Sequence, residues 1–283
     1  MDEEVVVGRL DGKVAFITGG ARGQGRSHAL TLAREGADIC VVDVCAPIDT
    51  VPYPLADPDD LATTASMVEE LGRRCLALTV DVRDSAAVDA AVGETIDQLG
   101  RLDICVANAG VCAFGAFWEI TDEMWNDMIA VNLTGAFNTM RAAAPPMMEQ
   151  GSGRIVATSS MGGRMGNPNL AHYVASKWGV IGLVKTLAKV VAAHGITVNA
   201  VCPATVDTEM VHNPALYGLF CPDLDEPTRD DVTPRYERMN PMGVPWADAQ
   251  DVSDAVLYLV SDEARRVTGT TLDVCMGGSA GMP

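Results

Sequence analysis

Residues 14–25 read VAFITGGARGQG, a short apolar run followed by a loop with glycines at positions 19, 20, 23 and 25. Glycines let the backbone turn tightly and approach a pyrophosphate, whose charge then faces the N-terminus of the next helix. A glycine triplet alone is weak evidence, but its position after a first strand and before a helix supports such a site. The stretch therefore predicts a dinucleotide-binding turn, with contacts expected from Gly19, Arg22, Gly23, Gln24 and Gly25.

The next apolar run ends at Asp43, about twenty residues further on, where a carboxylate can accept hydrogen bonds from the adenosine ribose. A carboxylate there would also repel a 2′-phosphate, which favours NAD over NADP. Arg22 argues the other way, because a guanidinium in the glycine loop can meet a 2′-phosphate. We let Asp43 decide, since it stands at the strand end, and expect Val44 beside it to line the same site. The alternative interpretation of Asp43 is an ordinary polar strand terminus.

Short apolar runs alternate with amphipathic segments from residue 13 onwards, the pattern of βαβ units. The expected strands are 14–18, 38–43, 75–81, 104–107, 154–159, 197–202 and 271–274. The expected helices are 27–35, 59–71, 85–99, 121–147, 174–193 and 249–260. The pattern predicts an α/β fold, a single Rossmann-type doubly wound parallel sheet of about seven strands with helices on both faces. No internal repeat or flexible linker divides the chain, so we expect one domain over residues 1–283.

Two segments interrupt this alternation. Residues 45–60, CAPIDTVPYPLADPDD, form an insertion rich in proline and aspartate where such folds usually have a short connection. A tolerated surface insertion and a functional segment both remain open for it. Residues 203–246 are long, contain many Pro, Met, Tyr and Phe residues, and show little periodicity. They are too apolar for disorder and follow a strand's carboxyl end, so we expect a substrate-side loop.

The composition limits the partners. A net charge of −18 argues against nucleic acid and against anionic membranes, and is typical of a solubility-promoting surface. No apolar run is long enough to span a membrane, and the acidic start, residues 1–4, is unlike a signal peptide. The eight cysteines are scattered and the four histidines form no pattern, so neither a metal site nor a disulfide framework is indicated. We therefore expect reduced thiols and a cytoplasmic location.

Tyr173 and Lys177 lie four residues apart in a segment with helical periodicity, so the two side chains share one helix face, about 6 Å apart along the axis. A phenol ionises near pH ~10, too high for a base at neutral pH, and a nearby cation is expected to lower the pKa of Tyr173. Ser160 follows an expected strand and is placed to hydrogen-bond a substrate oxygen beside the tyrosine. Such a pair also occurs by chance in many helices, so its meaning depends on the rest of the chain.

Taken together, these residues resemble the short-chain dehydrogenase/reductases over nearly the whole chain, residues 9–279. The resemblance rests on motifs in the family's order and spacing: Thr18-Gly-x-x-x-Gly23-x-Gly25, Asp81-Val82, Asn108-Ala109-Gly110, Asn132, Ser160 and Tyr173-x-x-x-Lys177. Within the family the chain looks most like the dehydrogenases grouped as mycofactocin-dependent or carveol-type. That finer similarity rests on residues 21–28, ARGQGRSH, and on residues 48–54, IDTVPYP.

The resemblance implies a role for each matched residue. Tyr173 would be the acid/base, Lys177 would hold the nicotinamide ribose, and Ser160 would orient the substrate oxygen. Asn132 would anchor a water that links Lys177 to solvent. The adenine would lie between Asp81 and Val82. Further NAD contacts are implied for Asn108, Ala109, Gly110, Pro203, Val206 and Thr208. The family usually has glycine where this chain has Ala204, which puts the contacts of Val206 and Thr208 in question.

The substrate follows less directly from the sequence. Apolar side chains flank the expected site, which favours a lipophilic alcohol or ketone, such as a terpenoid or alicyclic one, over a sugar or an acid. The expected wall consists of Met161, Met165, Phe114, Trp118, Met210, Leu216, Tyr217, Phe220, Met242 and Trp246. His172, beside Tyr173 on the helix, is expected to point elsewhere and to act as a rim or packing residue.

Several alternatives stay open. The insertion begins two residues after Asp43, so it can fold over the adenosine and retain NAD, and the resembling group implies reoxidation by the redox peptide mycofactocin. The nearest alternative is an ordinary dehydrogenase with exchangeable NAD(P). A nucleotide-binding regulator without catalysis is disfavoured by the intact set of Asn132, Ser160, Tyr173 and Lys177, and nothing marks a lyase or epimerase. The family resemblance also suggests a homotetramer built on the helices at 121–147 and 174–193.

Overall fold

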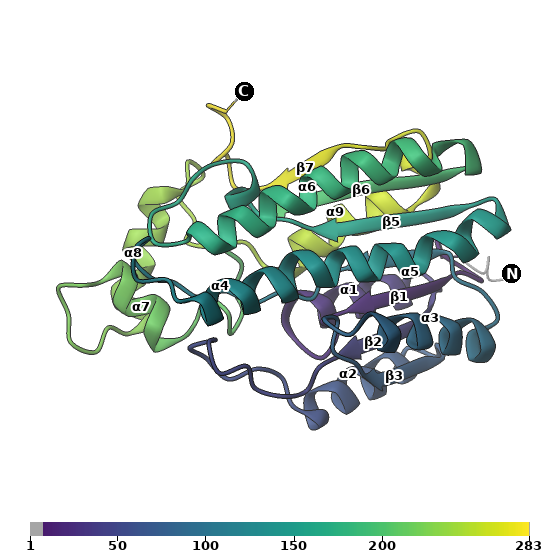
Figure 1. Ribbon diagram of the computed structural model, residues 1–283, viewed down its shortest axis with the longest axis horizontal. Coiled ribbons are helices and arrows are strands. Elements are labelled where there is room, and N and C mark those ends of the chain that lie inside the picture. The colour runs from purple at the N-terminus through teal and green to yellow at the C-terminus, as the bar shows by residue number, and fades with distance from the viewer. Residues whose placement is uncertain (1–7, 283) are drawn as a thin grey trace, which may run out of the picture.

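A computed structural model describes residues 8–282 of the chain (Figure 1). Its centre is one parallel sheet in the order β3-β2-β1-β4-β5-β6-β7. The strands are β1 (Val14–Thr18), β2 (Asp38–Asp43), β3 (Cys75–Thr79), β4 (Ile104–Ala107), β5 (Gly153–Thr158), β6 (Ile196–Pro203) and β7 (Thr271–Val274). The predicted Rossmann-type fold is confirmed, and the expected strands are all present, within two residues of their predicted ends.

Helices cover both faces of the sheet. The helices of the sheet layers are α1 (Gly23–Arg34), α2 (Pro58–Glu70), α3 (Ser85–Leu99), α5 (Gly135–Gln150), α6 (Ala171–Val191) and α9 (Ala249–Val260). One apolar core joins α3, α5 and α6 to the sheet, and a second joins α1, α2 and α9 to the other face. Alternate residues of β1 divide between the two cores: Phe16 belongs to the first, and Ala15 and Ile17 to the second. The central strands are buried on both sides, which explains their uniformly apolar sequences.

The helix predicted over 121–147 is a composite. It consists of α4 (Asp122–Ile129), one π-helical turn over Ala130–Thr134, and then α5. The π turn carries Asn132, one of the predicted catalytic residues. π-helical turns occur often at functional sites because they shift the following side chains around the axis. The 3.6-residue period of the sequence does not reveal such a local insertion.

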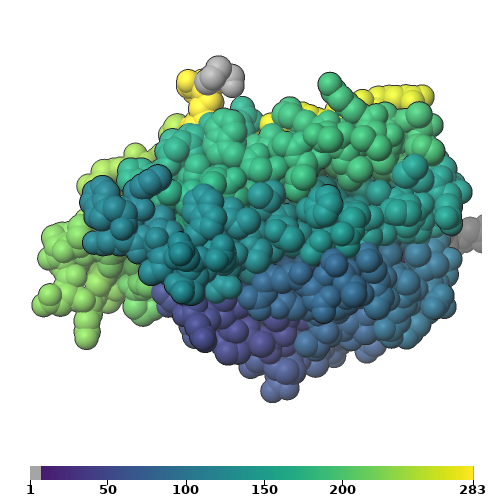
Figure 2. Space-filling model, in the orientation of Figure 1, coloured from purple at the N-terminus to yellow at the C-terminus, as the bar shows by residue number. Residues whose placement is uncertain are grey.

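Two helices were not predicted: α7 (Pro214–Phe220) and α8 (Arg229–Met239) both lie in the segment 203–246 that we interpreted as a loop. Both have helix-start signals, since Asn213 caps α7 and Thr228 forms a capping box with Asp231 at α8. Pro214 at the start of α7 and Pro234 inside α8 hide the periodicity. In Figure 1 and Figure 2 this part of the chain, in light green, projects beyond one end of the sheet.

Other differences are smaller. The structure starts α1 at Gly23 rather than at residue 27. The sequence did not reveal this first turn, since two of its four residues are glycines, which are poor helix formers. Residues 58–60, predicted to belong to the insertion, form the first turn of α2. Within residues 8–282, none of the helices has the length and apolar character needed to cross a bilayer. The acidic start at residues 1–4 lies outside the described residues.

Candidate active site at the carboxyl ends of the strands

One cavity lies at the carboxyl edge of the sheet and brings together residues from distant parts of the sequence. The predicted site residues that line it are Gly19, Arg22, Gly23, Gln24, Gly25, Asp43, Val44, Asp81, Val82, Asn108, Ala109, Gly110, Ser160, Tyr173, Lys177, Pro203, Val206 and Thr208. Asn132 is the one predicted site residue that does not line it. Sheets of this kind place ligands at this edge, so the cavity is the candidate active site.

The glycine loop lets the protein backbone approach a ligand closely. Gly19 has φ +66, and a Cβ built on it would lie 2.8 Å from Ala109 Cα. A Cβ on Gly25 would lie 1.9 Å from the Gly19 carbonyl oxygen. Neither position tolerates a side chain, and Gly23 opens α1 so that the free N–H groups of the helix face the cavity. This cradle fits the diphosphate of a dinucleotide.

Asp43 ends β2 beside this loop. Its carboxylate accepts hydrogen bonds from the backbone N–H of Ala21, at 3.2 Å, and of Cys45, at 3.4 Å. Burial raises the pKa of the Asp43 carboxyl, and the backbone N–H donors partly offset the rise. Arg22, the residue that argued for NADP, donates a hydrogen bond to the Pro54 carbonyl oxygen. Both residues line the cavity, but the Arg22 guanidinium is joined to the insertion.

The insertion is a packed part of the molecule, and we name residues 45–57 the strap. Ile48, Val51 and Tyr53 are buried in the same apolar core as Met128 and Val131. The side chains that line the cavity from the strap are Ile48, Tyr53, Leu55 and Ala56. The strap is therefore a wall of the candidate site. The sequence left open a tolerated surface insertion and a functional segment, and this packing favours the functional segment.

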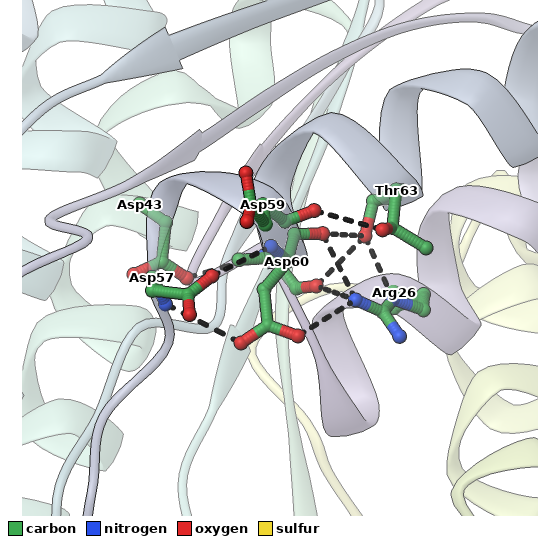
Figure 3. A network of polar contacts seen from close by, with 8 residues as sticks. Arg26, Asp43, Asp57, Asp59, Asp60 and Thr63 are labelled. Atoms are coloured by element: carbon green, nitrogen blue, oxygen red, sulfur yellow. Dashed lines mark hydrogen bonds and ion pairs between the residues drawn. The ribbon is translucent and has the colours of Figure 1, made fainter.

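Polar contacts fix the strap at several points. Thr50 donates to Asp127 of α4 at 2.8 Å, and the Tyr53 hydroxyl accepts from the Cys112 N–H at 3.0 Å. At the end of the strap, Asp57 caps α2 in a capping box with Asp60 (Figure 3). Arg26 of α1 reaches that same turn, donating to the Asp60 carbonyl oxygen at 2.9 Å (Figure 3). The strap is thus held by the glycine-loop side, by α4 and by the segment after β4.

The side of the cavity that the family resemblance assigns to the adenine carries an ion-paired carboxylate. Asp81 accepts from the Arg83 side chain at 2.8 Å and from the Arg83 backbone N–H at 2.9 Å. Arg83 holds the pKa of the Asp81 carboxyl below its ordinary value, although burial opposes this. Arg83 also lies 3.4 Å from Asp127, the carboxylate that binds Thr50 of the strap. Asp81 is therefore ionised and oriented, as a hydrogen-bond acceptor for an adenine amine would need to be.

Tyr173, Lys177 and Ser160 meet in the cavity. Lys177 is 4% exposed, and its Nζ donates to the Thr158 carbonyl oxygen at 2.9 Å and lies 5.6 Å from the centre of the Tyr173 ring. The Ser160 Oγ accepts from the Gly162 N–H at 3.0 Å. Gly162 is needed beside them, since a Cβ on it would lie 3.2 Å from the Tyr173 ring. Against a larger opposing effect of burial, Ser160 favours the ionised form of the Tyr173 phenol.

One electrostatic expectation is wrong for the protein as it stands. Burial raises the pKa of the Tyr173 phenol, and the Ser160 hydroxyl opposes only part of this rise. Burial also lowers the pKa of Lys177 to about 8, so the ammonium is itself destabilised. Lys177 Nζ donates to the Thr158 carbonyl oxygen. The desolvation of both groups outweighs the attraction between the Lys177 ammonium and a phenolate. The residues alone do not make Tyr173 a base at neutral pH.

Asn132 stands behind the cavity wall and is 1% exposed. Its Oδ1 accepts from the Val111 N–H at 2.8 Å, and its Nδ2 donates to the Val111 carbonyl oxygen at 2.9 Å. Gly110 lies between it and Lys177, because a Cβ on Gly110 would be 3.4 Å from both Asn132 Oδ1 and Lys177 Nζ. Asn132 thus fixes the chain that passes Lys177, while the water implied by the resemblance stays a prediction.

On the substrate side, residues 204–246 form a unit that we name the cap. Its ends are joined by a β-bridge between Val206 and Ala247. Only the first part of the cap reaches the cavity, through Ala204, Val206, Thr208, Glu209, Met210 and Val211. Thr208 lies against the glycine loop, 3.4 Å from a Cβ built on Gly23. Ala204, where the family usually has glycine, donates its N–H to Val274 at 3.0 Å and has no left-handed backbone.

The expected apolar wall is mostly wrong. Of its members, only Met210 lines the cavity. Trp118 and Met242 are 84% and 70% exposed, and Tyr217, Phe220 and Trp246 pack against Cys221, Val232 and Tyr236 in a separate core inside the cap. His172 is fully buried, with neither ring nitrogen hydrogen-bonded, so it is a packing residue and not a rim residue. Sequence reasoning assigned the segment to the cavity without seeing that it buries its own aromatic side chains.

Several lining residues were not predicted, among them Tyr53 of the strap, Thr158, Ser159 and Glu209. A signal for Tyr53 was present, since it stands between Pro52 and Pro54 and is the aromatic residue of the insertion. Exposure of a large aromatic side chain to water is unfavourable, so a tyrosine held between two prolines suggests burial. The insertion was identified, but its tyrosine was not separated from the rest.

Comparisons with known proteins agree with this geometry. The sequence model of the family described as short chain dehydrogenase matches residues 13–215. The (−)-trans-carveol dehydrogenase of Rhodococcus erythropolis is 44% identical over 95% of this chain and 98% of its own. The crystal structure of carveol dehydrogenase from Mycobacterium avium in complex with NAD is 51% identical, with a TM-score of 0.95 over 96% of this chain and 99% of that one. A short chain dehydrogenase from Mycobacterium paratuberculosis bound to NAD is 40% identical, with a TM-score of 0.89 over 96% and 100% of the two chains.

Proposed function

We propose that this chain, which belongs to the short-chain dehydrogenase/reductase family, is an oxidoreductase that moves a hydride between a secondary alcohol or its ketone and NAD. The observation that carries the proposal is the convergence of Ser160, Tyr173 and Lys177 on one cavity with a glycine cradle and the carboxylate of Asp43. The cradle fits a diphosphate, and the carboxylate fits an unphosphorylated ribose. NAD-bound relatives of similar sequence support the choice of cofactor.

Each residue has a step that its position supports. Ser160 holds the hydroxyl oxygen of the alcohol, and Tyr173 removes its proton as the carbon–hydrogen bond breaks. Oxidised NAD, when bound, supplies the hydride acceptor and a positive charge near the phenol. Because burial alone raises the pKa of Tyr173, this added charge and Lys177 together must favour the phenolate. Lys177 would turn from Thr158 toward the nicotinamide ribose, and Asn132 would keep the adjoining chain in place.

The first substrate to test is (−)-trans-carveol, because a relative that is 44% identical carries that name. We infer a lipophilic alicyclic or terpenoid alcohol, supported by the apolar residues Val111, Met210 and Val211 along the cavity. The assay adds carveol, cyclohexanol or a polyol to the purified protein with NAD or NADP and follows the absorbance of reduced nicotinamide. Faster reduction with polyols than with the cyclic alcohols would contradict the lipophilic assignment.

We further propose that NAD is retained under the strap and is reoxidised by mycofactocin. The support is that the strap lines the cavity and is bonded to the glycine loop, α4 and the segment after β4. Native mass spectrometry of protein purified without added cofactor tests retention directly. Nucleotide-free protein that turns over added NAD at steady state would favour the ordinary exchangeable dehydrogenase instead.

The assembly and location remain part of the proposal. We propose a homotetramer that uses the helices α5 and α6, which run across the face seen in Figure 2. Phe137, Trp178 and Val190 on these helices are 44%, 52% and 63% exposed, more than a free surface favours for such side chains. The same native mass spectrum gives the subunit count. A cytoplasmic location is consistent with eight free cysteines, and fractionation of the producing cells would test it.

A further inference from the structure

We propose that Tyr53, carried by the strap, is a positioning residue for the reaction at Tyr173, an inference that rests on the proposed oxidation of an alcohol in this cavity. Tyr53 is 6% exposed and lines the same cavity as Ser160 and Tyr173. It comes from the strap, for which we proposed retention of NAD, yet its hydroxyl reaches the segment after β4. A single side chain therefore connects the cofactor side of the cavity to its reacting side.

The contact that carries the proposal is the hydrogen bond from the Cys112 N–H to the Tyr53 hydroxyl oxygen, at 3.0 Å. The preceding residue, Val111, is held on both its N–H and its carbonyl oxygen by Asn132, at 2.8 and 2.9 Å. Two consecutive residues, the first of which lines the cavity, are thus fixed by two side chains from distant elements. Asn132 holds the first and Tyr53 holds the second.

This wall lies beside the reacting group. Val111 lines the same cavity as Ser160 and Tyr173. Without the Tyr53 hydroxyl, the partly buried Cys112 N–H loses its acceptor, and this part of the chain is free to shift toward another partner. Hydride transfer is sensitive to such shifts, since a misplacement of about 1 Å can cost about 100-fold in rate.

A purely structural role for Tyr53 predicts something different. If the side chain only closes the strap over NAD, removal of its hydroxyl would release nucleotide faster but leave the reaction of bound nucleotide unchanged. If it positions the wall, the reaction of bound nucleotide slows even where NAD stays in place. The affinity for the alcohol should change little, because the aromatic ring still fills the cavity wall.

The test is the variant Tyr53→Phe, which keeps the ring and removes only the hydroxyl. Single-turnover reduction of bound NAD by (−)-trans-carveol, normalised to the nucleotide content, should be about tenfold slower than in the unaltered protein, as expected for a lost buried hydrogen bond. The KM for carveol should change by less than about twofold, because uniform binding is not what is lost. The melting temperature and bound nucleotide are measured on the same samples.

Tyr236→Phe is the matched control. Tyr236 is also buried, but its hydroxyl makes no hydrogen bond and it lies in the core of the cap, away from the cavity lining. It should react at the unaltered rate. If Tyr53→Phe does not accumulate as folded protein, Tyr53→Met replaces it with an unbranched apolar side chain of comparable length, and the same slowing is expected.

The outcomes separate the two levels of the proposal. A Tyr53→Phe protein that reduces its bound NAD at the unaltered rate overturns the positioning role, whether or not it releases nucleotide more easily. A change confined to the KM for carveol, with the single-turnover rate unaltered, overturns it as well. If the unaltered protein reduces no NAD with carveol or cyclohexanol, the proposed function itself fails, and the positioning role fails with it.

Discussion

The strap and the cap are both irregular segments beside the same cavity, but they are built in opposite ways. The strap buries Ile48, Val51 and Tyr53 in the main core, and its polar contacts reach three other parts of the molecule. The cap packs Val232 and Tyr236 in a core of its own. It also leaves Met239 and Met242 57% and 70% exposed.

The polar contacts show the same contrast. Asp207 of the cap binds Arg229 and His212 of the cap, and Asp223 binds Arg235 of the cap. By comparison, the strap residue Thr50 binds Asp127 of α4, which also binds Arg83. A segment whose contacts are mostly internal can move as a unit, and one whose contacts lie in the core cannot. We infer that the strap holds the cofactor fixed and that the cap admits the substrate.

The largest expected effect comes from removing the chemistry that both segments serve. Tyr173→Phe should lower carveol oxidation by a factor of about 100 to 10,000, the usual contribution of a general base. Bound nucleotide and melting temperature should not change, because the Tyr173 hydroxyl contributes to neither the strap nor the cap. The rate is measured as single-turnover reduction of bound NAD, and the bound nucleotide is measured by native mass spectrometry. A variant that keeps its activity would exclude Tyr173 from the mechanism. The strap and the cap could then not be compared by their effects on a reaction at Tyr173.

A matched pair of core substitutions tests the contrast itself. Val51→Ala removes two methyl groups from the strap, and Val232→Ala removes two from the core of the cap; the two valines are 9% and 0% exposed. Each should cost about 1–3 kcal/mol of local packing. For Val51→Ala the loss should appear in the cooperative unfolding of the whole molecule, as a melting temperature roughly 2–6 °C lower, with weaker NAD retention.

Val232→Ala should behave differently, because the core it weakens belongs to the cap alone. We expect a higher KM for carveol and faster limited proteolysis within the cap, with a melting temperature close to that of the unaltered protein. Equal losses of melting temperature in both variants would show that the cap is part of the main cooperative unit. The distinction between the two segments would then be wrong.

A change of pH should loosen the cap before the strap. His212 lies 2.8 Å from Asp207 and contacts Tyr217, and burial, followed by the charge of Arg229, lowers its pKa below the ordinary value of 6.5, although Asp207 and Glu209 oppose this. Because the folded protein binds this proton less well than the unfolded chain, the stabilisation is complete above pH 6.5 and is lost as the pH falls through the lowered pKa.

The corresponding measurement is the KM for carveol against pH, which should rise severalfold on the acid side of neutrality while the bound NAD stays constant. His212→Gln has no such titration and should flatten the profile in this range. If the bound NAD is lost in parallel with the rise in KM, a group on the cofactor side is responsible, and the assignment to the cap fails.

The sequence predicted the strap and the cap unequally, for physical reasons. The sheet, the glycine loop and the cluster of Ser160, Tyr173 and Lys177 follow from local patterns, because strand periodicity and fixed motif spacing survive without knowledge of packing. The partners of the strap do not, since the bond between Tyr53 and Cys112 joins residues 59 apart in the sequence. No local sequence pattern predicts such a contact.

The errors have the same origin. The pKa of Tyr173 was predicted to fall because Lys177 is one helical turn away, but burial of both groups reverses the balance. The aromatic residues of the cap were assigned to the cavity because they are apolar and follow a strand. They are buried instead by one another, as Phe220 and Tyr236 are, with ring centres 4.5 Å apart. Composition indicates that such side chains avoid water, but it does not indicate which surface covers them.

The smallest expected effect tests whether the polar contacts of the strap matter beside its buried side chains. Thr50→Val keeps the shape of the side chain and removes the 2.8 Å hydrogen bond to Asp127. Asp127 keeps its contact with Arg83, so the cost should be limited to about 0.5–1.5 kcal/mol, or at most roughly a tenfold faster release of NAD. Exchange of bound NAD for isotopically labelled NAD, followed by native mass spectrometry, measures this rate.

Thr63→Val is the matched control, since the Thr63 hydroxyl donates only to the Asp59 carbonyl oxygen within α2 and is exposed (Figure 3). It should release NAD at the unaltered rate. Faster release in Thr50→Val alone places part of the retention in the contact between the strap and α4. Equal rates in the two variants would mean that burial of Ile48, Val51 and Tyr53 is sufficient to hold the strap. In that case the strap and the cap differ through their apolar cores, and the polar network around Asp127 serves only to orient Arg83 and Asp81.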